Sequence, residues 1–369
     1  MDILVTVACA TIAIGFLVFI HEGGHYLAAR AFGVRVTEFM LGLPGPSVGF
    51  TRGGTRFGVT AVPLGGYARV CGMEPGEMSP HLEDVLAALY RRGEATPADI
   101  AAVCAISEDD AFEALEELSE WGSVVAPKRS ARSDLYRAAA TYPAKRSRRR
   151  RTVADMVPQH IYKVGEARPV DDPHGLFESE LAQQYRSLPF WKRSVILLAG
   201  IAMNLLFAMA VFVLVFSVIG FDVQMTDTGE VMHRTLSPLQ AIQAGFMYIG
   251  MVIQAVANLF NPATAAQTVS DSTSIIGIAV LSRSYFEQGI IMALEFMAMI
   301  SVSLGIMNLI PIPPLDGGRF AIEVFQKLTR KTVSTRALSY LSLVGMALFL
   351  VLFVVMLNQD VQRFIFGNW

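Results

Sequence analysis

The sequence predicts an all-α polytopic membrane protein with four transmembrane helices, one interfacial helix, a membrane-dipping β-hairpin or sheet and a small cytosolic winged-helix-like domain. Hydrophobic residues make up 53% of the 369 residues and charged residues only 17%, a composition too apolar for a single soluble domain. The charges are also clustered, so several stretches contain none over a length that could cross a bilayer. The net charge of −2 averages a basic central segment against acidic stretches, and it indicates no class of partner by itself.

The first predicted span, residues 1–32, is an uncharged apolar run from Ile3 to Ile20 followed directly by HEGGH, residues 21–25. Histidines four residues apart share one face of a helix, where both imidazoles can bind one zinc ion. Glu22 lies about 100° further round the helix axis, close enough to act as a base on water at the metal. A packed pair of core histidines is the alternative, but unpartnered histidines at membrane depth would be costly. The motif therefore predicts a Zn²⁺ site with His21 and His25 as ligands.

Residues 33–75 are predicted to form a membrane-associated β-sheet. Glycines, alternating apolar residues and three prolines in this stretch are typical of short strands and turns. The best strand candidates are Phe57–Val62 and Tyr67–Val70, which we expect to be joined through Pro63–Gly66.

Residues 81–142 are predicted to be a soluble helical insertion. Three segments have helical spacing of apolar residues, with Thr96 and Ser107 as N-caps of the second and third. These segments are Leu82–Arg92, Thr96–Cys104 and Glu108–Trp121. Three short helices followed by a hairpin is the order of a winged-helix domain, although any small three-helix unit would look similar. Residues 143–190 are expected to be a basic run, Lys145–Arg151, and a linker without periodicity.

Further apolar stretches divide the remaining chain. The predicted elements are a second span at 191–221, an extracytoplasmic loop at 222–288 with an interfacial or re-entrant helix at 237–260, a third span with an LDG motif at 289–318, a cytosolic loop at 319–336, and a fourth span at 337–357.

The distribution of Lys and Arg orients these spans. Residues 128–151 contain ten Lys or Arg and one Asp, and another basic cluster at 327–336 precedes the last span. The N-terminus and the loop at 222–235 are poor in Lys and Arg. The positive-inside rule therefore predicts that the insertion and the 319–336 loop are cytosolic and that both termini are outside.

A zinc site needs a third protein ligand, and Asp316 is the candidate. His21 lies 18 residues beyond the outer end of the first span, and Asp316 follows about 20 helical residues that start from the same side. Both residues then reach similar depth. This match requires that the helix at 237–260 does not cross the membrane.

Two motifs together resemble those of the site-2 protease family of intramembrane zinc metalloproteases, and most closely its bacterial members that cleave anti-sigma factors. They are HEGGH on the first span and Asn308-x-x-Pro311-x-Pro313-x-Leu315-Asp316-Gly317 at the end of the third. The similarity covers residues 1–75 and 186–360. The short loop at 222–235 departs from the family, whose members usually have one or two PDZ domains in this place.

The resemblance implies a role for each motif residue. Zn²⁺ would be held by His21, His25 and Asp316, with Glu22 as the catalytic base. Substrate would bind at Asn308, Pro311 and Pro313 and, by strand addition, at the edge formed by Gly65, Gly66 and Tyr67. For Asn308, capping of the broken helix is the alternative role.

The implied activity is hydrolysis of peptide bonds within or near transmembrane segments, in regulated intramembrane proteolysis. Anti-sigma factors and signal-peptide remnants would be candidate substrates, as single-span proteins that another protease has already cut, in the bacterial cytoplasmic membrane. The basic run Lys145–Arg151 is expected to contact anionic lipid headgroups, and residues 81–142 a cytosolic partner. Acidic helix faces in the insertion disfavour nucleic acid as a partner.

Two other functions stay open. The chain could be a non-catalytic membrane sensor with structural zinc, which the presence of Glu22 disfavours. It could also be a membrane-tethered transcription regulator that reads DNA through the winged helix and the basic run. Salt-dependent binding to duplex DNA would identify the second.

Overall fold

The computed structural model describes residues 3–62, 65–73, 78–127, 134–141, 161–224 and 231–365. Among these residues are five helices long and apolar enough to cross a membrane. They are α1 (Ile3–Ala31), α6 (Phe190–Val213, continued by a π-helical segment to Ile219), α7 (Pro238–Leu259), α10 (Ile290–Asn308) and α12 (Thr335–Asp360). The prediction of a membrane protein built mainly from apolar helices is confirmed. How many of the five cross the membrane stays a prediction.

Helix α6 is the central element of the helical part. It packs against α1, α7, α10 and the amphipathic helix α11 (Asp316–Thr329). Its buried Ala208 and Phe212 belong to one apolar cluster with Ala298 and Val302 of α10. Small side chains at such crossings let helix backbones approach closely, as is usual for helices that pack within a membrane.

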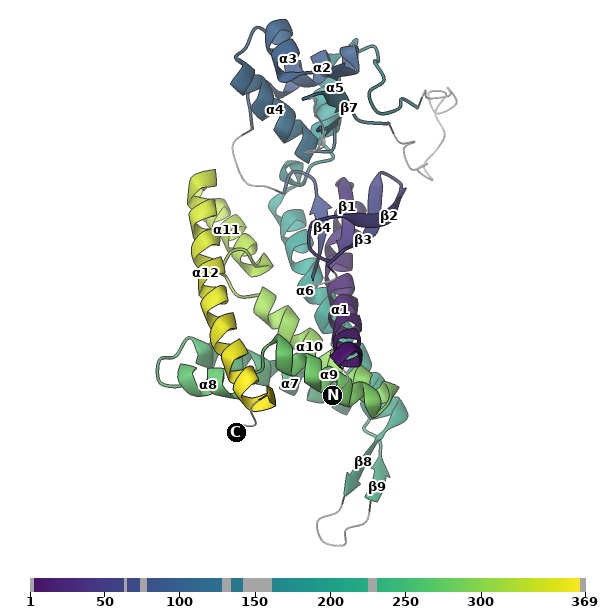
Figure 1. The fold of residues 1–369 in the computed structure, drawn as a ribbon, viewed down its shortest axis with the longest axis vertical. Helices are drawn as coiled ribbons and strands as arrows, with labels where there is room; N and C mark the ends of the chain where they lie inside the picture. The colour runs from purple at the N-terminus through teal and green to yellow at the C-terminus, as the bar shows by residue number, and fades with distance from the viewer. Residues whose placement is uncertain are drawn as a thin grey trace.

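Several elements gather at the end of the molecule opposite the helices α2–α4 (Figure 1). Helix α1 begins at this end and α12 finishes there. The hairpin of β8 (Phe221–Gln224) and β9 (Val231–Arg234), the helix α8 (Ala265–Asp271) and α9 (Ile275–Glu287) also lie at this end. Because α7 follows β9 and precedes α8, it starts and finishes on the same side of the molecule.

The last residue of α12 joins this helix to α9. Asp360 is fully buried, and its carboxylate accepts hydrogen bonds of 2.8 Å from the backbone N–H groups of Ser274 and Gly277. A carboxylate in this position satisfies free N–H groups at the start of α9 and is favoured by the helix dipole. Arg363 donates to the carbonyl oxygen of Ser272 at 3.3 Å, which reinforces the same junction.

A four-stranded sheet follows α1. Its strands are β1 (Val36–Leu41), β2 (Ser47–Arg52), β3 (Thr55–Thr60) and β4 (Gly66–Val70), in the spatial order β2-β3-β1-β4. The hairpin between β2 and β3 turns at Gly53 and Gly54, whose positive φ angles of 59° and 83° suit a two-residue turn. Strand β1 pairs with β3 in parallel and with β4 in antiparallel orientation, so β4 forms one edge.

The two best strand candidates, Phe57–Val62 and Tyr67–Val70, correspond to β3 and β4, which follow one another in the chain. They do not pair with each other, because β1 lies between them in the sheet. The parallel pairing of β1 with β3 depends on contacts distant in sequence, which local turn signals do not reveal. On the opposite edge of the sheet, Val48 is 86% and Phe50 is 65% exposed. Apolar side chains this exposed suit contact with lipid better than with water.

The small domain begins at Leu82. It contains α2 (Leu82–Arg92), β5 (Glu94–Ala95), α3 (Pro97–Cys104), α4 (Glu108–Glu120), β6 (Val124–Val125) and β7 (Tyr136–Ala138), with the strands in the order β5-β7-β6. Thr96 caps α3 in a reciprocal capping box with Asp99, and Ser107 caps α4 by accepting from the N–H of Asp110. Its core is formed by fully buried apolar side chains that include Leu86, Leu115 and Trp121.

A further helix, α5 (Pro173–Leu181), also belongs to the small domain. Leu176 and Phe177 pack against its core, and the ring of Phe177 stacks on Trp121 at 5.8 Å between centroids. Residues 173–181, which the sequence predicts to be part of a linker without periodicity, are therefore part of the small domain. The helix has only nine residues and a short apolar face, which gives too weak a periodic signal to detect. The predicted basic run Lys145–Arg151 lies outside the described residues.

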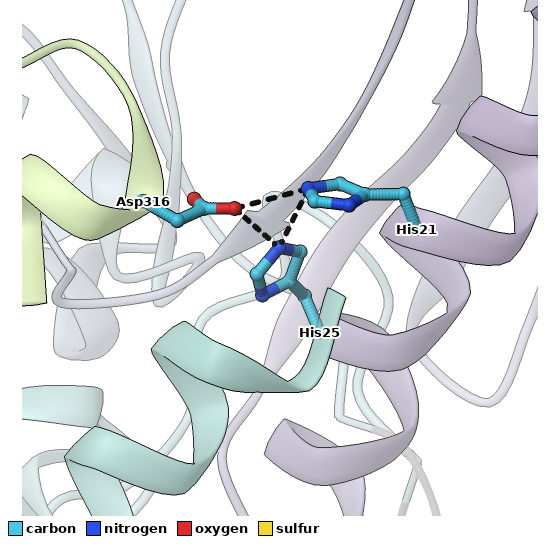
Figure 2. Close-up of side chains that lie close together, drawn as sticks. All are labelled: His21, His25 and Asp316. Atoms are coloured by element: carbon cyan, nitrogen blue, oxygen red, sulfur yellow. Dashed lines mark hydrogen bonds and ion pairs between the residues drawn. The ribbon is translucent and has the colours of Figure 1, made fainter. Parts of the chain in front are cut away.

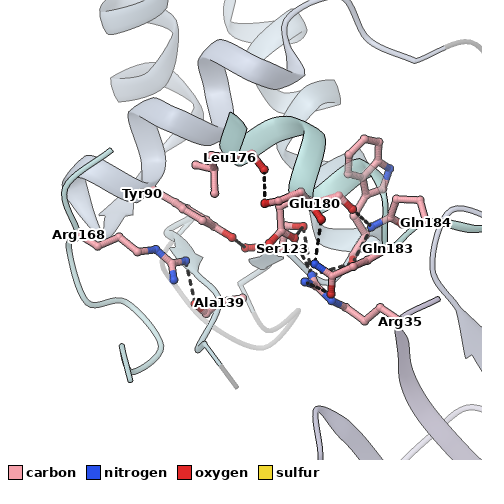
Figure 3. Close-up of polar contacts among 11 residues, drawn as sticks. Arg35, Tyr90, Ser123, Ala139, Arg168, Leu176, Glu180, Gln183 and Gln184 are labelled. Atoms are coloured by element: carbon pink, nitrogen blue, oxygen red, sulfur yellow. Dashed lines mark hydrogen bonds and ion pairs between the residues drawn. The ribbon is translucent and has the colours of Figure 1, made fainter. Parts of the chain in front are cut away.

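Arg35, just before β1, joins the small domain to the sheet (Figure 3). Its guanidinium forms an ion pair of 2.8 Å with Glu180, and it donates to the Gln183 side chain at 3.0 Å. It also donates to the Trp121 carbonyl and the Ser123 hydroxyl, each at 3.3 Å. These bonds are mostly buried, so the small domain is fixed to the start of the strand that pairs with β4.

Candidate metal centre

Three side chains from two distant parts of the chain meet beside α6 (Figure 2). His21 and His25 project from one face of α1, and Asp316 is the first residue of α11. The Oδ2 atom of Asp316 is 3.0 Å from Nε2 of His21 and 3.2 Å from Nε2 of His25, and the two Nε2 atoms are 3.3 Å apart. Both histidines are buried, and the Asp316 side chain is 20% exposed. The structure thus brings together the three predicted metal ligands.

The other nitrogen of each imidazole determines which atom is available as a ligand. Nδ1 of His25 lies 2.8 Å from the carbonyl oxygen of Ile196, an acceptor, so Nδ1 carries a proton, and in the neutral imidazole Nε2 then keeps its lone pair. Nδ1 of His21 lies 3.2 Å from the side-chain amide of Asn204. The oxygen of that fully buried amide has no hydrogen-bond partner as assigned. Exchange of the amide oxygen and nitrogen would let Oδ1 accept from Nδ1–H of His21.

This donor set fits zinc. A neutral imidazole that donates through Nδ1 presents only a lone pair at Nε2, so without a cation two lone pairs would face a carboxylate. Tetrahedral ligands about 2.0 Å from an ion lie about 3.3 Å from one another, which agrees with the three observed separations. Two histidines and one carboxylate with a fourth position left for water are typical of catalytic zinc sites.

Glycines make this meeting of elements possible. A Cβ on Gly24 would lie 2.4 Å from the carbonyl oxygen of Ala199, so α1 and α6 touch backbone to backbone there. A Cβ on Gly200 would lie 2.4 Å from Nε2 of His25 and 2.8 Å from Nε2 of His21. Any side chain at Gly200 would therefore occupy the space between the ligand atoms and α6. A Cβ on Gly23, in contrast, would meet nothing within 4 Å.

The loop that delivers Asp316 is also tightly packed. A Cβ on Gly317 would lie 2.3 Å from the carbonyl oxygen of Leu309, and one on Gly318 would lie 2.3 Å from the nitrogen of Pro313. The start of α11 therefore packs against the first residues of this loop, which explains why two glycines follow Asp316. The peptide bond between Pro313 and Pro314 is cis.

Glu22 lies next to the ligands, and its carboxylate contacts the sheet. Its Oε2 atom accepts a hydrogen bond of 2.8 Å from the backbone N–H of Ala68 in β4. A Cβ on Gly66 would lie 3.6 Å from Cγ of Glu22. The edge strand of the sheet thus lies directly against the face of α1 that carries Glu22.

The predicted substrate-binding residues are divided between two places. Gly65 is in the turn before β4 with φ +82°, while Gly66 and Tyr67 begin β4 and pair with Leu41 and Met40. Asn308 is the last residue of α10, and its amide donates to the carbonyl oxygen of Leu304 at 3.0 Å, which is the alternative capping role. In the loop after α10, Pro311 is exposed and Pro313 is half-buried.

Sequence reasoning assigned no role at the site to four contributors, which are Asn204, Gly200, Ala68 and Ile196. Ala199-Gly200 with Asn204 resembles the second span of the family, but the resemblance did not connect these residues with the ligands. Asn204 could have been suspected, because a lone amide in an uncharged span is costly unless it has a partner. Gly200 by itself does not differ from the many small residues of the spans. Ala68 and Ile196 act through backbone atoms, which side-chain identity cannot reveal.

We predict that Gly200→Ala lowers zinc affinity about ten-fold or more, because the added methyl group displaces the imidazoles. Gly23→Ala is the matched control and should stay within about two-fold of the unmodified protein, since alanine only improves helix propensity there. Competition of the purified full-length variants with a chromophoric chelator measures both affinities. Equal affinities for the two variants would contradict the packing described here.

Comparison with known proteins agrees with the geometry of this centre. The model of peptidase family M50 matches residues 9–352. A candidate zinc metalloprotease of Campylobacter jejuni is 25% identical over 96% of this chain and 92% of its own length. Similar candidate zinc metalloproteases from Rhizobium meliloti and Clostridium acetobutylicum are 27% and 24% identical over 95% and 96% of this chain, and 94% and 97% of their own lengths.

These matches confirm the resemblance to site-2 proteases that the two motifs indicate. With the family model covering almost the whole chain, and with the histidines and the aspartate of the two motifs meeting in one place, the chain belongs to peptidase family M50, a family of zinc-dependent metalloproteases.

Proposed function

We propose that this protein is an intramembrane zinc metalloprotease that hydrolyses peptide bonds within or near the transmembrane segments of membrane proteins. The observation that supports this most directly is the meeting of His21, His25 and Asp316 on apolar helices, with Glu22 beside them. Single-span proteins already cut by another protease, such as anti-sigma factors or signal-peptide remnants, are the proposed substrates.

Zinc held by His21, His25 and Asp316 would polarise the scissile carbonyl group and make a water molecule more acidic. Glu22 takes a proton from this water on a carboxylate oxygen while the water oxygen bonds to the carbonyl carbon. Glu22 then passes the proton to the amide nitrogen as the C–N bond breaks, which leaves a carboxylic acid and an amine. Transfer of the acid's proton to the amine gives the final carboxylate and ammonium group. The carbonyl of Ile196 and the amide of Asn204 hold the two imidazoles in the required orientation.

The substrate must lose its helical structure before cleavage, because a helix hides its peptide bonds within its own hydrogen bonds. Strand β4 offers the means, since it is the edge of the sheet and lies against Glu22. An unwound segment would add to this edge beginning at Gly65, Gly66 and Tyr67. Pro311 and Pro313 would contact the segment from the loop before Asp316, while Asn308 is better explained as a cap of α10.

We further propose that the protein lies in the bacterial cytoplasmic membrane with four crossings, both termini outside and the small domain in the cytosol. The basic residues at 128–151 and 327–336 favour this orientation. Four crossings are supported by the position of α7, both of whose ends lie at the end of the molecule where α1 begins and α12 finishes. In this arrangement α7 lies at the outer interface and does not cross the membrane. The sequence of Lys145–Arg151 suits contact with anionic headgroups on the cytosolic side.

The small domain is proposed to be a winged-helix-like regulatory unit that binds a cytosolic protein segment. The order of its elements and the β5-β7-β6 sheet support the fold assignment. Helix α4 exposes Glu108, Asp109 and Glu113, which would repel phosphate groups and disfavour binding of DNA. These carboxylates suit the Lys- and Arg-rich segments that flank transmembrane helices on the cytosolic side. A purely structural zinc site in a non-catalytic sensor is disfavoured by the position of Glu22.

We predict that Glu22→Gln reduces cleavage at least about a hundred-fold while zinc stays bound, because glutamine cannot accept the proton. His25→Ala and Asp316→Ala should lose both zinc and cleavage. Glu295→Gln, which replaces another membrane glutamate, is the matched control and should keep both. Quantitative proteomics of membrane stubs in cells that produce each variant, with metal analysis of the purified proteins, measures these outcomes. Undiminished proteolysis by Glu22→Gln would remove the proposed mechanism.

The proposed topology predicts opposite accessibility for two exposed alanines, Ala266 in α8 and Ala98 in α3. In a background without other cysteines, Ala266→Cys should react with a membrane-impermeant maleimide in intact spheroplasts. Ala98→Cys should react only after the membrane is opened. Protection of Ala266→Cys in intact spheroplasts would place α7 across the membrane and refute four crossings.

The small domain's role can be tested through Arg35. We expect Arg35→Ala to leave the mostly buried Glu180 unpaired and to weaken docking by about 2–3 kcal/mol, so that hydrogen exchange in α5 and the set of cleaved stubs both change. The control variant Arg137→Ala removes an exposed ion pair with Glu94, which should lower stability by no more than about 0.5 kcal/mol. It should change neither the hydrogen exchange in α5 nor the set of cleaved stubs. If Arg35→Ala speeds exchange in α5 but leaves the stubs unchanged, the domain has no part in substrate selection.

A further inference from the structure

The hydrogen bond between Glu22 and Ala68 uses a group that strand addition would also need. Strand β4 pairs with β1 on one side only, and N–H groups along a strand point alternately to its two sides. The N–H of Ala68 points away from β1, because it donates to Glu22 at 2.8 Å. By the same alternation, the N–H of Gly66 points to this free side. Any strand that adds to β4 must therefore take the N–H of Ala68 with one of its carbonyl oxygens.

In the observed arrangement the N–H of Ala68 is already used by Glu22, so an added strand cannot bond to it there. A Cβ on Gly66 would lie 2.7 Å from Cγ1 of Val18, so β4 rests directly on α1 at this point. Glu22 is on the same face of α1, one helical turn further along. Strand β4 and α1 are therefore packed together here, and the hydrogen bond between Ala68 and Glu22 joins them. Gly65, with its φ of +82°, lies in the turn that would have to adjust if an added strand moved β4 away from α1.

We propose that the backbone N–H of Ala68 positions the substrate and is exchanged between two acceptors. In the free protein this N–H donates to the carboxylate of Glu22, and in the complex it donates to a carbonyl oxygen of the added strand. Insertion of the strand thus releases Glu22 at the moment when a peptide bond is placed beside it. This inference deepens the proposed proteolytic function and depends on it.

The exchange explains how such a protease could spare intact transmembrane helices. The carbonyl oxygens of an intact helix are already bonded within the helix, so they compete poorly for the N–H of Ala68. A carboxylate that accepts from a backbone N–H forms a stronger bond than a neutral acceptor does. Only an extended segment, which can bond to Gly66 and Ala68 together, offers enough contacts to displace Glu22. The residue that bonds to Ala68 then fixes the register of the substrate on β4.

The test compares two variants that both lack the base, Glu22→Gln and Glu22→Ala, as full-length zinc-loaded protein in detergent micelles. The amide oxygen of glutamine can still accept from Ala68, whereas alanine leaves that N–H free. The probes are a tripeptide hydroxamate with apolar side chains, which has a backbone that can pair with β4, and acetohydroxamate, which has none. Titration calorimetry gives the affinity of each variant for each probe.

We expect Glu22→Ala to bind the tripeptide hydroxamate about three- to ten-fold more tightly than Glu22→Gln, and both variants to bind acetohydroxamate equally. Equal affinities for the tripeptide hydroxamate would overturn the proposal. Adding Ala68→Pro to Glu22→Ala removes the N–H, and a proline is tolerated where the N–H of an edge strand points outward. The gain in affinity should then disappear, and a gain that persists in a zinc-loaded double variant would also overturn the proposal.

Should the double variant fail to bind zinc, the comparison of Glu22→Ala with Glu22→Gln decides alone. A parallel cleavage assay of the unmodified protein separates this inference from the proposed function. Absence of cleavage together with the expected affinity difference would remove the proteolytic function and leave Ala68 as a peptide-binding group.

Discussion

The side chains of His21, His25 and Asp316 direct lone pairs at one buried position, and the surrounding structure depends on how this position is satisfied. Groups of this kind are expensive to bury in an apolar region unless a cation joins them. Much of the observed packing serves to bring them there. The helices α1 and α6 touch backbone to backbone at Gly24, the loop before α11 folds tightly around Gly317 and Gly318, and Gly200 leaves room for both imidazoles.

The sheet determines from which side a peptide can approach the metal centre. Strand β4 packs against α1, and the N–H of its middle residue, Ala68, donates to Glu22. The base therefore lies beside the expected path of a peptide on the free edge of the sheet. The small domain joins the same sheet through Arg35, at the start of the strand that pairs with β4. A change in the position of the small domain would therefore be transmitted to the strand that contacts Glu22, through backbone pairing and one mostly buried ion pair. This physical connection supports regulation by the small domain. Only residues 220–237 separate the end of the helical segment that continues α6 from the start of α7, and this is too few for a further domain.

Much of the centre could be predicted from sequence, because its chemistry lies in side chains at fixed spacing. Histidines four residues apart must share a helix face, and the similar depth predicted for the two motifs pairs His21 with Asp316 although 295 residues separate them. The helices of the small domain were also predictable, since Thr96 and Ser107 are strong caps before periodic apolar runs. Other features depend on contacts that no local pattern encodes. They include the parallel pairing of β1 with β3, the docking of the short helix α5, and the backbone groups of Ile196 and Ala68.

X-ray absorption at the zinc edge of the purified full-length protein tests the central claim most directly. The account predicts one zinc ion per chain, with two imidazole nitrogens and one or two oxygens at about 2.0–2.1 Å and no sulfur ligand. It also predicts that Asp316→Ala removes the bound zinc. A sulfur shell at about 2.3 Å from any of the three cysteines, or a spectrum unchanged by Asp316→Ala, would contradict a metal centre formed by α1 and the start of α11.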